Sequence, residues 1–153
     1  MKAILQRVRS AKVEIDNKTA GEIGQGLMIL LGVVEGDDVE QADFLAEKAV
    51  HLRIFEDENG KMNRSLFDIG GGMLVVSNFT LCADARHGRR PSFTGAAKPD
   101  MANALYERFV AAVKDEGAAP VQTGVFGADM LVSIANDGPV TIVLDTDEIM
   151  KKA

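Results

Sequence analysis

Two polar segments are the candidates in this sequence for carrying chemistry. Residues 77–81 (SNFTL) turn an apolar run abruptly polar, and residues 136–141 (NDGPVT) separate two alternating apolar stretches. Taken alone, each pattern is more typical of a strand end or a turn than of a site.

Other familiar catalytic and metal-binding arrangements are absent from the sequence. The chain has two histidines, His51 and His87, and one cysteine, Cys82, and these do not cluster at the spacing of metal ligands. It contains neither a G-x-S-x-G nucleophile motif nor a G-x-x-x-x-G-K-[ST] phosphate loop. We therefore expect no metal and no cofactor. A Ser-His-Asp triad stays open, because its members are assembled in space.

One short loop is basic in an otherwise acidic chain. The net charge of −6 argues against charge-driven binding to duplex nucleic acid, which depends on a basic surface. It does not exclude local contact with one RNA end. Arg86, Arg89 and Arg90 form a basic run with His87 and Gly88. This run predicts either a solvated loop or a local phosphate contact.

Apolar periodicity predicts about seven or more strands that would position these segments. An opening strand is expected near residues 3–9, and the alternation of Val13 and Ile15 with charged neighbours predicts a second, half-buried one. Residues 27–34 and 73–76 are continuous apolar runs, and the first of them is expected of a strand covered on both faces.

Turn signals divide these strands. Asn59-Gly60 predicts a hairpin turn, and the glycine run at residues 70–72 predicts a flexible turn. Residues 136–139 are expected to be the turn between the last two strands, with Pro139 at the first position of the second.

Two helices are expected. Asp37 or Asp38 could cap the first, and Pro99 is well placed to begin the second, which Gly117 would end. Helical spacing assigns their apolar faces to two sets of residues, which are Val39, Ala42, Leu45, Ala46 and Ala49 in the first helix, and Met101, Leu105, Phe109 and Val113 in the second.

These elements indicate a mixed α/β fold in which helices cover one face of stacked sheets. The sequence shows no linker, repeat or low-complexity segment, so residues 1–153 are expected to form one domain. Charge appears within a few residues of the N-terminus, and no apolar run is long enough to span a bilayer. We expect a cytoplasmic protein with no membrane contact.

Taken together, the two polar segments resemble the signatures of the D-aminoacyl-tRNA deacylase family. The family motif S-Q-F-T-L is similar to S-N-F-T-L here, and N-x-G-P-V-T is matched by N-D-G-P-V-T. Further similarities run in order along essentially the whole chain, at residues 6–8, 21–24, 53–55, 60–63, 90–93 and 128–130. The departure is Asn78, which is one methylene shorter than the glutamine usual in the family.

The resemblance implies a three-layer β/β/α sandwich that forms a homodimer and hydrolyses the ester of D-aminoacyl-tRNA, with glycyl-tRNA as a further substrate. The implied catalytic segment is Ser77, Asn78, Phe79 and Thr80, with backbone N–H groups on the carbonyl and Phe79 against the terminal adenine. Thr80 could be a nucleophile, but no histidine is near it in sequence. A positioning role, with help from the RNA 2′-hydroxyl, is favoured.

The resemblance also implies how L-amino acids are excluded. Gly138-Pro139 would form a cis peptide bond whose carbonyl oxygens project into the partner subunit's pocket, so that active sites are completed across the dimer. Arg7 is expected to hydrogen-bond this turn, and Met130 is assigned to the same substrate-binding set. Arg86, Arg89 and Arg90 are candidates for contact with the tRNA acceptor end.

Two alternatives remain. One is a deacylase of the same fold with relaxed specificity that accepts L-alanyl-tRNA, which a trans Gly138-Pro139 bond would favour. The other is a non-catalytic, dimeric nucleic-acid-binding module, which the acidic composition argues against.

Overall fold

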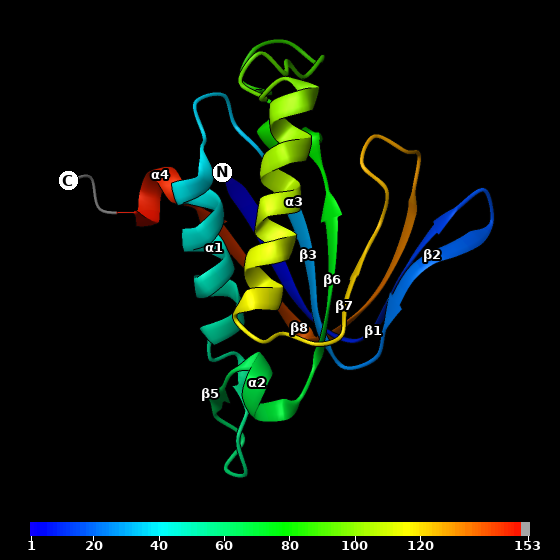
Figure 1. The fold of residues 1–153 in the computed structure, drawn as a ribbon, viewed down its shortest axis with the longest axis vertical. Coiled ribbons are helices and arrows are strands. Elements are labelled where there is room, and N and C mark those ends of the chain that lie inside the picture. The colour runs from blue at the N-terminus through cyan, green and yellow to red at the C-terminus, as the bar shows by residue number, and fades with distance from the viewer. Residues whose placement is uncertain (151–153) are drawn as a thin grey trace.

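The computed structural model describes residues 1–150 (Figure 1). The elements follow in the order β1 (Lys2–Ile15), β2 (Lys18–Ile23), β3 (Gly26–Gly32), α1 (Val39–His51), β4 (Phe55–Glu56), β5 (Met62–Arg64), α2 (Leu66–Ile69), β6 (Gly72–Ser77), a 3-10 turn η1 (Phe79–Cys82), α3 (Pro99–Asp115), β7 (Val121–Thr123), β8 (Leu131–Asp145) and α4 (Thr146–Ile149).

Six strands form one strongly curved sheet. Its order is β2-β1-β3-β6-β7, with β8 along the other edge of β1. Strand β1 pairs with β3 through its first half and with β2 through its second half. Strands β3, β6 and β7 are parallel to one another, whereas β8 is antiparallel to β1. Because β2 comes back to contact β6 and β7, the sheet is nearly closed.

The two faces of the central strands are buried in different clusters. Leu27, Ile29 and Leu31 of β3 face the cluster shared with α1 and α3, whereas Met28 faces a second cluster with Leu74 of β6 and residues of β1 and β2. Side chains alternate across a strand, so β3 is covered on both sides, as its apolar run predicts. Figure 1 shows α1 and α3 side by side on one face of the sheet.

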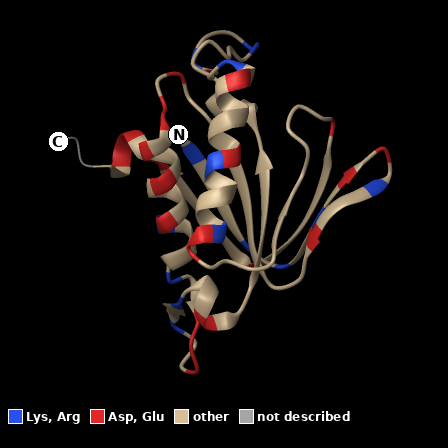
Figure 2. Cartoon of the chain, in the orientation of Figure 1, with Lys and Arg blue, Asp and Glu red and all other residues tan. Residues whose placement is uncertain are grey.

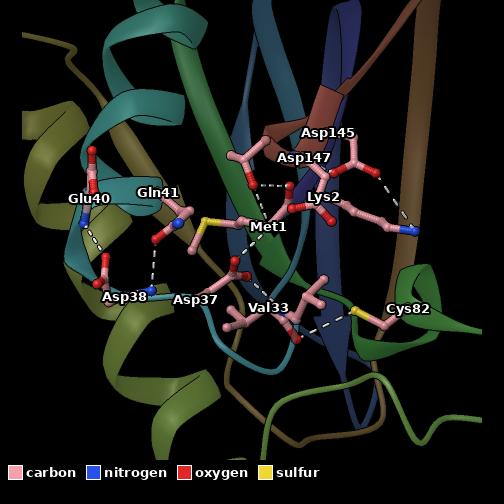
Figure 3. A network of polar contacts seen from close by, with 12 residues as sticks. Met1, Lys2, Val33, Asp37, Asp38, Glu40, Gln41, Cys82, Asp145 and Asp147 are labelled. Atoms are coloured by element: carbon pink, nitrogen blue, oxygen red, sulfur yellow. Dashed lines mark hydrogen bonds and ion pairs between the residues drawn. The ribbon is translucent and has the colours of Figure 1, made fainter. Parts of the chain in front are cut away.

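The local signals at the helix starts are confirmed. Asp38 caps α1 by accepting from the N–H of Glu40, and Gln41 completes a capping box. Asp37 instead accepts from the Met1 ammonium group at 2.9 Å and from the Val34 N–H at 2.7 Å (Figure 3). Helix α3 begins at Pro99 as predicted.

Several expectations about the elements are wrong. The two strands expected over residues 3–15 are one strand, because β8 pairs along its length and no glycine or proline interrupts it. Two single-turn helices, α2 and α4, were not expected. Gly70 is the left-handed C-cap of α2 rather than part of a loose turn. Val39 and Met101 are exposed, because each lies in the first turn of its helix, where burial has not begun.

The turn expected at residues 136–139 is also corrected. Both halves of β8 run in the same direction along β1, since Gln6 pairs with Thr141 and Val8 pairs with Asn136. Residues 137–140 are therefore a bulge within one strand rather than a hairpin. The Asn136 side chain closes the bulge by accepting from the Val140 N–H at 2.8 Å and donating to the Val140 carbonyl at 3.1 Å.

The other turn prediction is confirmed, since Asn59-Gly60 lies in the hairpin that joins β4 to β5. No helix within residues 1–150 is long and apolar enough to cross a membrane.

Candidate active site

A cavity of about 870 Å³ opens where β6 ends. Residues 77–80 form one wall, the segment 126–130 forms another, and the first two turns of α3 close it on a third side. Leu30 and Leu31 of β3 and Val76 of β6 also line it. The walls are largely apolar with a few polar groups, which is typical of a small-molecule site.

Local backbone structure places the 77–80 segment at this cavity. The N–H of Asn78 donates to the Leu31 carbonyl at 2.8 Å, which extends the β3–β6 ladder by one residue. The chain then turns sharply into η1, whose first residues are Phe79 and Thr80. The first N–H groups of a helical turn have no acceptor within that turn, so those of Phe79 and Thr80 are not used by η1 itself.

The Thr80 hydroxyl donates a short hydrogen bond to Oδ1 of Asn78. Its proton is thereby engaged, and the oxygen lone pairs remain as acceptors. The shorter side chain at position 78 therefore contacts Thr80. This arrangement suits positioning better than nucleophilic attack, because the acceptor of the Thr80 proton is an amide oxygen, which is not a general base.

Neither histidine lines the cavity among the described residues. His51 contacts Glu116 at 3.1 Å and packs on Phe67, at the far ends of α1 and α3. The chain thus forms no Ser-His-Asp triad in this cavity. The Cys82 thiol is buried, which raises its pKa and makes it a poor nucleophile. Within residues 1–150, no three His, Cys, Asp or Glu side chains come together as metal ligands.

Phe79 stands at the mouth of the cavity. Its side chain is 60% exposed, and its ring lies 5.0 Å from that of Phe93 at an angle of 59°. An exposed aromatic ring beside a cavity is suited to stacking on an unpaired base. Phe93 belongs to the 90–93 segment that resembles the family, and it lies in the cavity wall.

Of the substrate-binding candidates, only Met130 shares this cavity with residues 77–80. Within residues 1–150 of one chain, Arg7, Gly138 and Pro139 are not among the lining residues. Gly138 and Pro139 are exposed on the β8 bulge, and the peptide bond between them is cis. The structure therefore separates the two motifs within one chain.

Arg7 is buried beneath the β8 bulge. Its Nε donates to the Asp137 carbonyl at 3.0 Å and its Nη1 donates to the Ile54 carbonyl at 2.9 Å. Nη2 lies 3.8 Å from a carboxylate oxygen of Glu56. One guanidinium group thus joins the bulge to the chain segment after α1.

The three loop arginines are not equivalent. Arg86 forms a bidentate pair with Asp84 at 2.8 and 2.9 Å, and this pairing lowers the pKa of Asp84 to about 2. Asp84 also forms two backbone hydrogen bonds with Ser92. Arg89 and Arg90 are exposed, and neither forms an ion pair with the described part of the chain. In Figure 2, short blue segments mark basic residues in this loop, above the N-terminal end of α3.

Sequence reasoning missed Tyr106 and Phe126, which both line the cavity. Tyr106 donates to the Val75 carbonyl at 2.8 Å, and its burial raises its pKa to about 12, so it is a neutral part of the wall. The sequence held part of the signal, because Ala102 and Tyr106 are four residues apart and therefore lie on the same face of a helix. The structure shows that both are buried on α3.

Comparison with known proteins finds relatives that match nearly the whole chain. The D-Tyr-tRNA(Tyr) deacylase family model matches residues 4–145. The D-aminoacyl-tRNA deacylases of Thermosipho africanus and Clostridioides difficile are each 55% identical over 97% of this chain and 99% of theirs.

Two solved structures share the fold. The c-Myc DNA unwinding element binding protein has a TM-score of 0.89 at 37% identity, covering 95% of this chain and 98% of that chain. A probable eukaryotic D-amino acid tRNA deacylase has a TM-score of 0.78 at 21% identity, covering 94% and 97%. The matches over nearly the whole chain show that this chain belongs to the D-Tyr-tRNA(Tyr) deacylase family.

Proposed function

We propose that this chain hydrolyses the ester bond of D-aminoacyl-tRNA and releases free amino acid and tRNA. The observation that carries the proposal is a cavity lined by residues 77–80 and Met130, with the exposed Phe79 among them, in a chain of this family. Water adds to the ester carbonyl, the bond to the ribose oxygen breaks, and that oxygen regains a proton.

An aminoacyl ester is already reactive, so positioning and oxyanion stabilisation suffice for catalysis. Backbone N–H groups at Phe79 and Thr80 hold the carbonyl oxygen as charge develops. The Phe79 ring stacks on the terminal adenine, and the Thr80 hydroxyl, oriented by Asn78, positions the substrate. The RNA 2′-hydroxyl assists the reaction in place of a protein base.

Rejection of L-amino acids requires a second copy of the chain. In the proposed homodimer, main-chain oxygens of Gly138 and Pro139 enter the partner's cavity and occupy the direction of an L side chain. The exposure of this bulge supports the proposal, as do the exposed apolar side chains of Leu131 and Val143 on the edge strand β8. Glycine lacks a side chain to exclude, so glycyl-tRNA is also hydrolysed.

The same proposal includes the remaining features of the family. Residues 1–153 form one domain, a three-layer β/β/α sandwich in which the curved sheet supplies two layers and α1 with α3 the third. Arg89 and Arg90, with a smaller part for Arg86, contact phosphates of the acceptor end. The cytoplasm, where aminoacyl-tRNA is used, is the proposed location.

Side-by-side hydrolysis of D-tyrosyl-, L-tyrosyl- and glycyl-tRNA tests the proposal. D-tyrosyl- and glycyl-tRNA should lose their amino acid while L-tyrosyl-tRNA stays intact. L-alanyl-tRNA in the same series distinguishes the relaxed-specificity alternative, which predicts rapid loss of L-alanine. Absence of turnover on every ester would refute a deacylase function.

A nucleic-acid-binding role is the second candidate, because a structure at 37% identity is that of a DNA unwinding element binding protein. The net charge of −6 argues against broad DNA binding. Gel-shift titration with uncharged tRNA and duplex DNA tests it. Tight binding to either without ester turnover would favour this candidate over the deacylase.

A further inference from the structure

Gly124 lies directly after β7, against the side chain of Met130. A Cβ atom built on Gly124 would be 2.5 Å from the Met130 sulfur and 3.7 Å from its terminal methyl carbon. It would also lie 3.6 Å from a methyl group of Val13. The thioether of Met130 therefore occupies the space that any larger residue at position 124 would take.

The surroundings of the Met130 side chain differ in how easily they can be displaced. On one side it packs against the cluster of Val13, Met28 and Leu74, whose members are fully buried. On the other side it lines the cavity of about 870 Å³. Close-packed interiors resist displacement, so a Met130 side chain pushed away from position 124 moves into the cavity.

We propose that Gly124 is a positioning residue for the reaction, because its missing side chain keeps Met130 withdrawn and the cavity open. The inference rests on the proposed function, in which this cavity receives the aminoacyl-adenosine end of tRNA. Gly124 touches no substrate itself. It acts through Met130 alone.

Gly124→Ala is the direct test. Gly124 has no positive φ, and the nearest atom is the end of a flexible side chain, so the variant should fold. We expect kcat/KM for D-tyrosyl-tRNA to fall about tenfold, mainly through KM, as expected when one methyl group overpacks a site. Gly24→Ala is the matched control, because nothing lies within 4 Å of its added Cβ.

A double-mutant cycle separates positioning through Met130 from a general structural effect. Once Met130→Ala has removed the side chain, Gly124→Ala should change kcat/KM less than twofold. Additive losses in the double variant would overturn the inference, as would a Gly124→Ala variant that behaves like Gly24→Ala.

A readout independent of turnover keeps this inference distinct from the proposed function. The Met130 methyl resonance in protein labelled with ¹³C-methyl methionine should shift in Gly124→Ala and not in Gly24→Ala. An inactive wild type with this shift would refute the deacylase function and retain the contact. An active wild type without the shift would overturn the inference alone.

Discussion

The 77–80 segment and the 137–140 bulge use polar residues in opposite ways. The first lines a largely apolar cavity, and its Thr80 hydroxyl pairs with Asn78. The second is exposed on an edge strand, and it is held from below by Arg7 and from within by Asn136. The first segment lines a cavity formed within one chain, whereas the second is exposed and, in the proposed function, enters the cavity of a second copy.

The largest expected effect comes from a substitution in the β8 bulge. A Cβ on Gly138 would lie 2.8 Å from a Val140 methyl carbon and 3.1 Å from Nη2 of Arg7, at a φ of +135°. Gly138→Ala should therefore displace the bulge, and the preference for D- over L-tyrosyl-tRNA should fall about a hundredfold. Competitive deacylation of the two esters measures this ratio, with Gly95→Ala as control. Unchanged selectivity would refute exclusion by the bulge.

The next effect concerns how the bulge is held. Arg7→Ala leaves the Asp137 and Ile54 carbonyls without their donors, and we expect a loss of about 2 kcal/mol in the free energy of unfolding. Urea denaturation measures it. Arg9→Ala is the matched control, because Arg9 is 82% exposed and lies 3.5 Å from a carboxylate oxygen of Asp137. Equal losses in both variants would contradict the role given to Arg7.

A smaller effect tests the cavity mouth. Phe79→Ala should raise KM for D-tyrosyl-tRNA about tenfold, since stacking on a base contributes on the order of 1–3 kcal/mol. The Phe79 ring is exposed, so the unfolding temperature should change little. Met62→Ala removes a comparably exposed side chain on β5 and serves as control. A change in kcat with no change in KM would argue against stacking.

A still smaller effect tests whether the three arginines of the basic loop differ in their contact with tRNA. Replacing Arg89 and Arg90 together with Glu should raise KM for tRNA about fivefold and flatten its salt dependence. Arg86→Gln should have less effect, because Asp84 already compensates the Arg86 charge. Steady-state kinetics at two salt concentrations compare them. Insensitivity of the double variant would leave the loop as ordinary solvated surface.

The smallest effect distinguishes positioning from nucleophilic attack. Thr80→Val keeps the shape of the side chain and removes the hydroxyl that donates to Asn78. We expect kcat to fall about threefold, because a neutral hydrogen bond contributes about 1 kcal/mol or less. Single-turnover kinetics measure the chemical step. A loss of a thousandfold or more would assign Thr80 as the nucleophile.

The sequence predicted those features of the fold that depend on residues within a single helix or strand. The capping by Asp38, the start of α3 at Pro99 and the two-sided burial of residues 27–32 follow from local chemistry and from side-chain periodicity. The bulge was mistaken for a hairpin because Asn, Gly and Pro suit both, and only pairing with β1 distinguishes them.

The sequence by itself determined the family, both motifs and most local boundaries, because these depend on residue type and short spacing. Tertiary structure alone decided which groups share the cavity. Residues 77–80 meet Tyr106, Phe126 and Met130 through the register of the sheet and the packing of α3. The same register keeps Gly138 and Pro139 out of that cavity within one chain, because contacts between distant segments follow from strand pairing rather than from neighbouring residues.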